Sequence, residues 1–450
     1  MKNKHSLKGK HVLVFGMGLS GIAATRLLLQ VGASVLFFDT KEEQDEKIQL
    51  EFEGRCLIRY GSLIEEDLEG IDIVVISPGI PLDIPLVMSW KERGLPIWGE
   101  IELAYVCGLG DVLAITGTNG KTTTTALLGE IMKTHQENTF VVGNIGIPYT
   151  EMALETNQHS IIVAEVSSFQ LETIHTFHPK VSAILNITED HLDRHHTMEA
   201  YIEAKKSITT NQNAEDYCIL NYDNPITREL AKDMKAQVIF FSRTERINNG
   251  VYIVDGAIVS RIRNREVICD VDQLRLLGEH NQENVMAAVA MAICYGVSTD
   301  EIRTALRTFK GVAHRLEYVT EYHGVVYYND SKGTNPDAAI KAIKAMNRPT
   351  LLIGGGYDKE SAYDEWIEAF DGKVKELVLL GATKEKIRDC AIAHGFTKIT
   401  LVEDMQEAVR VCMAHASPGD AVLLSPACAS WGMYRNFEER GDHFKNLILK

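Results

Sequence analysis

Short apolar runs recur along the whole chain, and each is followed by a cluster of glycine and polar residues. Residues 11–15, 161–165 and 325–329 are such runs, with the length and composition of buried strands. The segments between the runs carry apolar residues at helical spacing, as in residues 122–132. Strands that alternate with helices predict the α/β class with mainly parallel sheets, in which ligands bind at the carboxyl ends of the strands.

The alternating pattern starts afresh twice, and a length of 450 residues suits about three domains. We expect a Rossmann-like domain over residues 1–100, a central P-loop ATPase-like domain over residues 101–311, and a second Rossmann-like domain over residues 312–450. Each is predicted to be built on a mainly parallel sheet. Inside the central domain the pattern is weaker, and a hairpin is expected near the Asn-Asn-Gly of residues 248–250.

Residues 116–122 lie between an apolar strand and a helix and have the pattern of a phosphate-binding loop. The usual pattern has glycine where this chain has Ile115, so the loop is a variant. Gly117 and Gly120 permit a tight turn that brings backbone N–H groups close to phosphate oxygens. Lys121 has the position from which a lysine bridges the terminal phosphates. The loop therefore predicts a nucleoside triphosphate site.

A triphosphate site requires Mg²⁺, which prefers carboxylate and hydroxyl oxygens as ligands. Thr122 follows the loop lysine, and Glu165 ends a predicted strand, which is where a metal-binding carboxylate is expected. The alternative for Glu165 is a solvated glutamate at a strand end. Thr122 and Glu165 are the candidate magnesium ligands.

A group of histidines and an aspartate follows another predicted strand. His191, Asp193, His195 and His196 offer zinc ligands, but their spacing is not that of a closed zinc site. Alternatively, the group caps the next helix. Lys205 falls on that helix, where a solvated surface lysine is the simplest interpretation.

Three charged residues of the last domain are further candidates. Asp330 and Lys332 precede a predicted helix, so a role in capping that helix competes with a role in chemistry. Arg315 is either a surface arginine or a guanidinium that binds a γ-phosphate bidentately.

Residues 16–21 form a complete G-x-G-x-x-G between a predicted strand and helix, and Asp39 follows about 20 positions later. This pattern is typical of NAD or FAD binding, but the same geometry suits any ligand that has a pyrophosphate and a ribose. A second turn, at residues 77–81, follows another apolar strand. The first domain is therefore expected to bind a dinucleotide or a related ligand.

Composition excludes several classes of protein. The chain has 46 basic and 62 acidic residues, and a net charge of −16 argues against nucleic acid as a partner. Its eight cysteines show no CxxC pair and no paired framework, which indicates a reducing compartment. The apolar part near the N-terminus is broken by glycines, so we expect no signal peptide, and no run is long enough for a membrane helix. A cytoplasmic, monomeric enzyme that does not insert into membranes is expected.

Several of these motifs together resemble the Mur ligases, the ATP-dependent amino-acid-adding enzymes of bacterial peptidoglycan synthesis. The resemblance covers essentially the whole chain. It rests on the loop at residues 116–122, on residues 165–168 and on Asp190 with His191. Residues 425–430 and 435–441 are similar to the branch of the family that adds D-glutamate.

The resemblance implies an ATP-dependent amide ligase of cell-wall biogenesis. Such an enzyme adds D-glutamate to UDP-N-acetylmuramoyl-L-alanine through an acyl phosphate and a tetrahedral intermediate, and it releases ADP and phosphate. The expected cofactors are ATP and Mg²⁺. The first domain would then bind the UDP part of the substrate in place of NAD.

The family also implies a role for each matching position. Catalytic roles fall on Lys121, Glu165, His191, Lys205, Arg315 and Lys332. The implied ATP-binding residues are Gly117, Thr118, Asn119, Gly120, Lys121, Thr122, Thr123, Asn281, Asn284, Arg315 and Asp330. The implied magnesium ligands are Thr122, Glu165, His191 and Lys205, the last as a carbamate, which converts a cation into an anion.

The two other substrates have implied sites as well. The UDP substrate is expected at Gly18, Leu19, Ser20, Asp39, Thr40, Ser77, Gly79, Asn144 and Ser167. D-Glutamate is expected at Thr334, Lys359, Ser430 and Phe437. The chain departs from the family at Lys41, where arginine is common, which affects one contact on the uridine side.

Other functions compete with this interpretation. Another Mur ligase would share most of the motifs, and a folylpolyglutamate synthase-like ligase would share the phosphate loop but lacks the N-terminal nucleotide-binding unit. An NAD-dependent oxidoreductase would explain residues 16–21 and leave Lys121 without a role. A nucleotide-sensing switch would need no amino-acid pocket.

Overall fold

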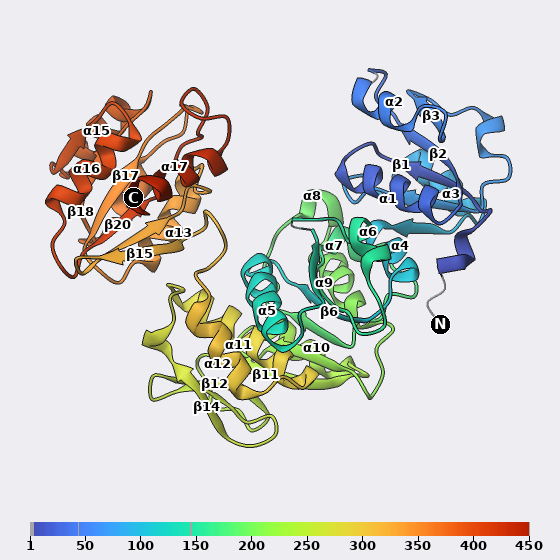
Figure 1. The fold of residues 1–450 in the computed structure, drawn as a ribbon, viewed down its shortest axis with the longest axis horizontal. Coiled ribbons are helices and arrows are strands. Elements are labelled where there is room, and N and C mark those ends of the chain that lie inside the picture. The colour runs from blue at the N-terminus through green and yellow to red at the C-terminus, as the bar shows by residue number, and fades with distance from the viewer. Residues whose placement is uncertain (1–3, 44, 145, 450) are drawn as a thin grey trace. The chain divides into compact units, whose positions relative to one another are not determined.

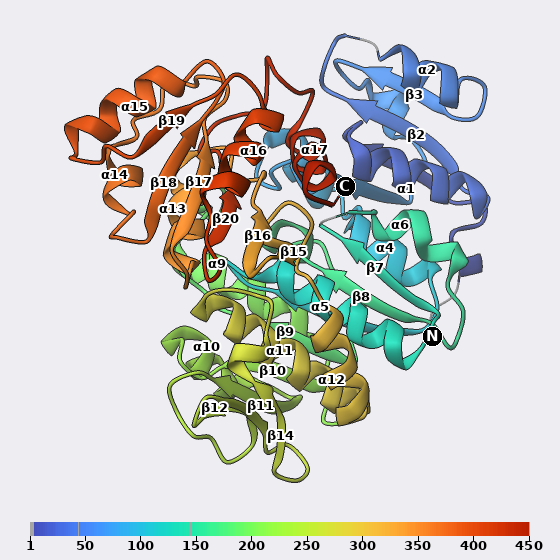
Figure 2. The ribbon, with the colours of Figure 1, turned by 60° about the vertical axis from the view of Figure 1, so that its left-hand side comes forward.

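The computed structural model describes residues 4–43, 45–144 and 146–449. The chain forms two compact units, of which the first contains residues 1–269 and 283–305 and the second contains residues 270–282 and 306–450. Three sheets form the framework, two in the first unit and one in the second (Figures 1 and 2). The predicted α/β class with mainly parallel sheets is confirmed.

The N-terminal sheet has five parallel strands in the order β3-β2-β1-β4-β5. Its strands are β1 (His11–Phe15), β2 (Ser34–Asp39), β3 (Leu57–Tyr60), β4 (Ile73–Ile76) and β5 (Ile97–Gly99). The accompanying helices are α1 (Leu19–Gln30), α2 (Glu46–Phe52), α3 (Pro85–Glu92) and α4 (Glu100–Cys107). Alternate residues of β1 enter two different cores, with Val12 and Val14 in one and Leu13 and Phe15 in the other. Both faces of the sheet are therefore buried, as a parallel sheet requires.

The central sheet has nine strands in the order β14-β13-β12-β11-β10-β9-β6-β8-β7. They are β6 (Asp111–Thr116), β7 (Thr139–Gly143), β8 (Ile161–Glu165), β9 (Val181–Ile184), β10 (Tyr217–Asn221), β11 (Gln237–Ser242), β12 (Gly250–Val254), β13 (Ala257–Ser260) and β14 (Glu266–Asp270). The helices are α5 (Lys121–His135), α6 (Tyr149–Met152), α7 (Ser168–Leu171), α8 (Leu192–His195), α9 (Met198–Lys206), α10 (Pro225–Leu230), α11 (Glu279–Tyr295) and α12 (Thr299–Thr308). Strands β6 to β12 pair in parallel, so their carboxyl ends form one edge.

The predicted hairpin is present, but its turn is not at residues 248–250. Strands β12 and β13 pair antiparallel through Asp255 and Gly256, which have φ values of 50° and 76°. Gly250 is instead the first residue of β12, which pairs in parallel with β11. A parallel neighbour cannot be reached through a tight turn, so the reversal falls on the next pair of turn-forming residues.

The C-terminal sheet has six strands in the order β15-β16-β20-β17-β18-β19. They are β15 (Glu317–Tyr322), β16 (Val325–Asn329), β17 (Thr350–Gly354), β18 (Val374–Leu379), β19 (Ile399–Leu401) and β20 (Ala421–Leu424), and only β15 pairs antiparallel. The helices are α13 (Pro336–Ala345), α14 (Asp364–Glu368), α15 (Lys384–Ala393), α16 (Met405–His415) and α17 (Phe437–Leu449). Strand β16 leads directly to Asp330, and β20 leads to Ser425, so the predicted polar clusters follow strand ends as expected.

Two buried glutamates attach α4 to the central domain. The Glu102 carboxylate is fully buried and accepts hydrogen bonds from the backbone N–H groups of His175, Thr176 and Phe177, at 2.8–3.0 Å. Glu100 accepts from the backbone and the hydroxyl of Thr150, at 2.7 and 3.0 Å. Burial raises the pKa of Glu100. Because buried carboxylates need such donors, these contacts fix the chain at the end of the N-terminal sheet.

No described helix combines the length and the apolar character that are needed to cross a membrane. The eight cysteines all lie in the described residues, and no disulfide joins them, as predicted.

Candidate active site

The predicted phosphate loop joins β6 to α5 and depends on its two glycines. Gly117 and Gly120 have φ values of 150° and 85°, and Gly120 is the residue at which α5 is capped. A Cβ atom on Gly120 would lie 2.2 Å from Oδ1 of Asn284. Both the backbone conformation and the close approach therefore require glycine, and the loop presents the N-terminus of a 15-residue helix to an anion.

Two lysines converge on this loop. Lys121 Nζ donates to the carbonyl oxygens of Gly117 and Thr118, at 2.8 and 2.9 Å. Lys205 Nζ donates to the same Gly117 carbonyl at 2.8 Å, from a helix 88 residues away in sequence. Two lysine Nζ atoms thus meet at one carbonyl, in a chain whose net charge is negative.

Lys205 is buried, which contradicts its interpretation as a solvated surface lysine. The side chain is 2% exposed, and its Nζ lies 4.6 Å from the centre of the Tyr201 ring. Burial, together with repulsion from Lys121, lowers the pKa of Lys205 from 10.5 to about 7, although Asp190 opposes the shift. Near neutral pH a large share of Lys205 is therefore the neutral amine, which is the form that adds to CO₂.

The loop is held from the segment after β9 by Asn186, which sequence analysis did not single out. Its backbone carbonyl accepts from Thr118 N at 2.9 Å. Its side chain accepts from Asn119 N at 2.8 Å and donates to the Asn119 carbonyl at 3.2 Å. The Thr118 hydroxyl also lies 3.1 Å from the Tyr201 hydroxyl. The signal for Asn186 was its place directly after a buried strand.

Glu165 ends β8 with its carboxylate only half satisfied. The residue is 2% exposed, which contradicts a solvated strand-end glutamate. Oε1 accepts from Asn144 Nδ2 at 3.0 Å, whereas Oε2 is buried and has no hydrogen-bond partner among the described residues. A buried carboxylate oxygen without a donor is costly, and a divalent cation relieves that cost. The residues present therefore fit Mg²⁺, and Thr122, half-buried on the first turn of α5, supplies a second oxygen of the required type.

The histidines of the predicted cluster have separate partners. His191 is exposed, adopts a left-handed conformation (φ 53°) and lies 3.5 Å from Asp190. His195 is buried beside the Ser168 hydroxyl at 3.0 Å, and burial lowers its pKa. His196 pairs with Asp83 at 3.1 Å.

This separation contradicts the two alternatives for the cluster. Side chains with separate partners do not form one zinc site, and in the described residues these histidines do not approach one another as ligands. The next helix, α9, is capped by Thr197, whose side chain accepts from Ala200 N at 3.1 Å. His195 and His196 are therefore not its caps.

The glycine-rich turn of the N-terminal sheet is closed by Asp39 and Ser77. Asp39 accepts from Met17 N at 2.8 Å and from Lys41 N at 3.1 Å, so its carboxylate fixes the turn itself. The Ser77 hydroxyl donates to the Gly16 carbonyl at 3.1 Å.

The remaining residues predicted for the UDP substrate lie at the ends of helices and strands. Gly18 caps α1, Leu19 and Ser20 begin it, Thr40 follows β2, Gly79 lies in the turn after β4, and Ser167 caps α7. Leu19 is 81% exposed.

In the second unit, Asp330 is buried directly after β16. It accepts from the Ser425 hydroxyl at 2.7 Å and from Leu316 N at 3.2 Å. Burial raises the pKa of Asp330 from 3.8 to about 7. The helix-cap alternative is wrong for Asp330, because α13 is capped by Asn335, whose side chain accepts from Ala338 N.

Arg440 was missed by sequence analysis, although it lies within the motif at residues 435–441. It is 3% exposed and donates to the Ser331 hydroxyl, to the Ser331 carbonyl and to the Cys428 carbonyl, at 2.7–3.0 Å. Ser331 in turn donates to the Phe437 carbonyl at 2.8 Å. The buried guanidinium thus joins the segment after β16 to the segment after β20. Its role depends on contacts 109 residues apart, which no local pattern reveals.

The other candidates of the second unit have these surroundings. Lys332 Nζ lies 5.5 Å from the centre of the Phe437 ring, and Lys359 Nζ lies 4.8 Å from that of Trp431. Ser430 is buried, whereas Arg315 is exposed. Asn281 donates to the Leu277 carbonyl at 2.7 Å, and Thr334 N donates to the Lys332 carbonyl at 2.8 Å. Thr123 is buried on the first turn of α5 in the first unit.

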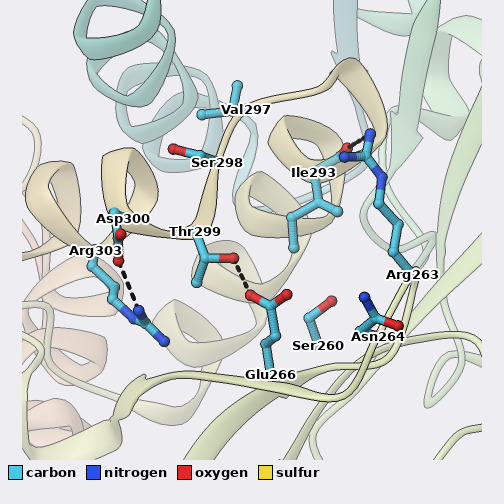
Figure 3. Close-up of a pocket in the computed structure, with 10 residues that line it drawn as sticks. All are labelled: Ser260, Arg263, Asn264, Glu266, Ile293, Val297, Ser298, Thr299, Asp300 and Arg303. Carbon is cyan, nitrogen blue, oxygen red and sulfur yellow. Dashed lines mark hydrogen bonds and ion pairs between the residues drawn. The ribbon is translucent and has the colours of Figure 1, made fainter.

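A separate pocket of about 370 Å³ lies where the β13–β14 turn faces α11 and α12, and no predicted site residue lines it (Figure 3). Several of its polar side chains make structural contacts. Arg263 donates to the Ile293 carbonyl and Thr299 to Glu266, while Arg303 donates to the Val267 and Ile268 carbonyls and to Asp300. These contacts join the β13–β14 segment to α11 and α12.

A glycine loop between a parallel strand and a helix, with a lysine on its carbonyls and a buried carboxylate at the neighbouring strand end, is the arrangement of the phosphate-loop nucleotide-binding proteins. Family models match residues 10–99 (Mur ligase MurD-like, N-terminal domain), 115–292 (Mur ligase middle domain) and 314–428 (Mur ligase, glutamate ligase domain). The chain belongs to the Mur ligase family.

Relatives match over nearly the full length. A UDP-N-acetylmuramoylalanine–D-glutamate ligase of Lachnoclostridium phytofermentans is 54% identical over 98% of both chains. One of Clostridioides difficile is 49% identical over 98% of this chain and 99% of the relative. Among solved structures, MurF of Acinetobacter baumannii has a TM-score of 0.59 at 18% identity, covering 92% of this chain and 91% of the other. A UDP-N-acetylmuramate-alanine ligase of Thermotoga maritima has a TM-score of 0.56 at 18% identity, covering 98% and 99%. These structures confirm the fold.

Proposed function

We propose that this protein is an ATP-dependent ligase that joins D-glutamate to UDP-N-acetylmuramoyl-L-alanine in peptidoglycan precursor synthesis. The observation that carries the proposal is the phosphate loop, with Lys121 on its carbonyls and the half-satisfied Glu165 carboxylate at the neighbouring strand end. The relatives support the choice of amino acid, because they bear the name of the D-glutamate ligase over nearly the whole chain.

The substrate carboxylate must be activated before an amine can attack it. The negative charge of the carboxylate repels an amine, and oxide is a poor leaving group. Transfer of the γ-phosphoryl group of ATP to the L-alanyl carboxylate forms an acyl phosphate and releases ADP. The amine of D-glutamate then attacks the carbonyl carbon, and the tetrahedral intermediate expels inorganic phosphate and loses a proton.

The residues of the loop supply positioning and charge. Lys121 exchanges its two carbonyl partners for phosphate oxygens, and the N–H groups at the start of α5 bind the same anion. Glu165, Thr122 and His191 would hold Mg²⁺, which when bound neutralises charge on the phosphates. Lys205 acts as a carbamate: its neutral amine takes up CO₂, loses a proton and becomes an anion that stabilises the cation.

Residues of the second unit complete the assignment. Arg315 and Lys332 stabilise charge that develops on the transferred phosphoryl group, and Asp330 and Asn281 bind ATP together with Asn284, which belongs to the first unit. D-Glutamate binds through Thr334, Lys359, Ser430 and Phe437. The UDP substrate binds at the glycine-rich turn of the N-terminal sheet, with Asp39 keeping that turn in shape. The acyl phosphate must be protected from water, so ligands are expected to close the molecule. Equal scattering curves with and without ATP and substrate would contradict this closure.

The same proposal covers the arrangement and setting of the enzyme. We assign residues 1–100 to UDP-substrate binding, residues 101–311 to ATP binding, and residues 312–450 to binding of the amino acid with a contribution to the ATP site. The protein acts as a cytoplasmic monomer, and the free cysteines of the described residues support the assignment to a reducing compartment.

The decisive experiment measures phosphate release from ATP with a panel of amino acids. Release that requires both UDP-N-acetylmuramoyl-L-alanine and D-glutamate is the expected result. Release with L-lysine or another amino acid in place of D-glutamate would indicate a different Mur ligase. A change in nicotinamide absorbance without phosphate release would overturn the proposal in favour of an oxidoreductase, and nucleotide binding without amide product would favour a switch.

A further inference from the structure

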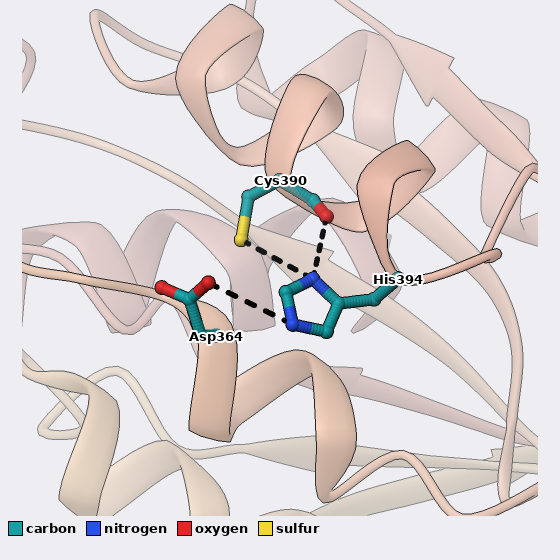
Figure 4. Close-up of side chains that lie close together, drawn as sticks. All are labelled: Asp364, Cys390 and His394. Carbon is teal, nitrogen blue, oxygen red and sulfur yellow. Dashed lines mark hydrogen bonds and ion pairs between the residues drawn. The ribbon is translucent and has the colours of Figure 1, made fainter.

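Four side chains that the proposed reaction does not use lie together on two helices of the second unit. Asp364 and Glu368 are the first and last residues of α14, Cys390 lies in α15, and His394 directly follows α15. The ligand atoms of Asp364, Cys390 and His394 all lie within 4.8 Å of one another (Figure 4). The group combines a thiol, an imidazole and two carboxylates.

The spacing of these residues directs each pair to one side of its helix. Both pairs are four positions apart, and the His394 N–H donates to the Cys390 carbonyl at 3.2 Å, so the helical turn extends to His394. The two helices are also firmly placed, because Ile367 of α14 and Ile387 of α15 are buried in the same apolar core. The ligand atoms are thus held by rigid backbone, and not by a loose surface loop.

The distances within the group are longer than hydrogen bonds. His394 Nε2 lies 3.7 Å from Asp364 Oδ1 and 3.8 Å from Glu368 Oε1, and Cys390 Sγ lies 3.9 Å from His394 Nδ1. Hydrogen bonds between such groups are about 2.7–3.2 Å long. Ligand atoms around a tetrahedral Zn²⁺ are about 3.3–3.6 Å apart, as its bond lengths require. The ligand atoms of Asp364, Cys390 and His394 lie within 4.8 Å of one another, so small side-chain rotations would have to bring them closer by up to about 1 Å when the ion binds.

The orientation of the His394 ring is fixed by the other ring nitrogen. Nδ1 lies 2.9 Å from the Cys390 backbone carbonyl, and since a carbonyl can only accept, Nδ1 carries a proton. In the neutral ring, the lone pair of Nε2 then points at the two carboxylates. Zinc-binding histidines characteristically donate their other N–H to a carbonyl or carboxylate in this way.

We propose that Asp364, Cys390 and His394 bind one Zn²⁺ ion, with water as the fourth ligand and the Glu368 carboxylate beside the His394 ring. The thiolate and the imidazole favour zinc over Mg²⁺, which prefers oxygen ligands only. On binding, a Zn–S bond replaces the S–H bond of Cys390, and the thiol proton passes to water. The ligating carboxylate and thiolate balance the charge of the ion, and the imidazole is neutral. The ion fastens α14 to α15.

The test titrates the full-length protein with Zn²⁺ against a chromophoric chelator, in an excess of Mg²⁺ that occupies oxygen-rich sites. One zinc ion per chain is expected. C390S and H394A should each weaken binding at least 10-fold, because even the loss of an outer-shell partner costs about 10–100-fold. H415A is the matched control, since His415 pairs with Glu376 at 3.0 Å in the same unit but does not belong to the proposed site, and it should bind zinc like the native chain.

Co²⁺ gives a second readout that identifies the thiolate. A cobalt–thiolate charge-transfer band is expected in the native chain and in H415A, and it should be absent in C390S. Zinc affinity that is unchanged in C390S and H394A, zinc that Mg²⁺ displaces, or no zinc binding at all would overturn the proposal. Phosphate release by the same variants reports their folding and tests the ligase proposal separately, because none of the four residues belongs to the ligase site.

Discussion

Replacement of Lys205 by methionine is expected to stabilise the folded protein at neutral pH, although it removes a residue of the proposed active site. The reason is that the native chain must bury a lysine that would otherwise be charged. The pKa of Lys205 is lowered from 10.5 to about 7 by burial first and by Lys121 second. Methionine keeps the length of the side chain without a group that must be desolvated. The Gly117 carbonyl remains paired in the variant, because Lys121 Nζ also donates to it at 2.8 Å.

The size and direction of the effect follow from proton linkage. A lowered pKa in the folded state means that the unfolded state binds more protons between about pH 7 and pH 10.5, so the native chain becomes more stable as the pH rises through this window. At pH 7 the penalty for burying Lys205 is about 4 kcal/mol, and by pH 9 it has fallen by about 2 kcal/mol. Loss of the cation–π contact between Lys205 and the Tyr201 ring reduces the gain in stability by about 1 kcal/mol. Lys205→Met should therefore gain about 3 kcal/mol at pH 7 and about 1 kcal/mol at pH 9.

The assay is urea unfolding of both chains at the two pH values, in buffers free of CO₂ so that no carbamate forms. Lys206→Met is the matched control, because the neighbouring lysine is paired with Asp233 at 3.0 Å and its pKa is raised by that hydrogen bond. The control should gain no stability at pH 7. A stability difference between Lys205→Met and the native chain that stays constant from pH 7 to pH 9 would refute the reasoning, since it would mean that Lys205 keeps an ordinary pKa when buried.

Three further predictions concern the same groups. Lys121→Ala should lower phosphate release by about 10³-fold, as expected for a cation that clamps phosphoryl groups, and near-normal turnover would mean that the loop has another role. Lys205→Ala should lose activity and regain part of it in acetate, because a free carboxylate can replace the carbamate; a lack of rescue at every concentration would remove support for the modification. Asp330→Asn should abolish a pH dependence of stability. Because the pKa of Asp330 is raised to about 7, the free energy of unfolding of the native chain should fall by about 2 kcal/mol between pH 5 and pH 7, and unfolding curves of the variant should not show that fall.

The features that sequence analysis identified are those encoded within a few residues. The phosphate loop is one, because Gly117, Gly120 and Lys121 are fixed relative to the flanking strand and helix by chain connectivity alone. The strands were found with similar success, since a parallel strand that is buried on both faces is a continuous apolar run, as in β8 and β17.

The features that sequence analysis missed depend on distant contacts. Lys205 lies on a helix with both polar and apolar residues, and only its bond to the Gly117 carbonyl, 88 residues away, makes it a buried group. His191, His195 and His196 are close in sequence, but the left-handed conformations of His191 and His196 direct the chain so that the three rings meet different partners. The spacing of residues in the sequence predicts that their side chains meet only within a helix or strand, and in this segment the helix α8 has just four residues.

The central site combines a buried carboxylate oxygen that lacks a hydrogen-bond donor with two lysines that meet at one carbonyl. Glu165 has one buried oxygen without a hydrogen-bond partner among the described residues, and Lys121 and Lys205 donate to the same Gly117 carbonyl. Each of these costs free energy in the folded chain, and each is relieved by a ligand of opposite sign, a cation for the carboxylate and an anion for the lysines. A cation and an anion that bind together therefore stabilise the site more than either alone. In the proposed function, that coupling favours a metal–triphosphate complex over the free nucleotide.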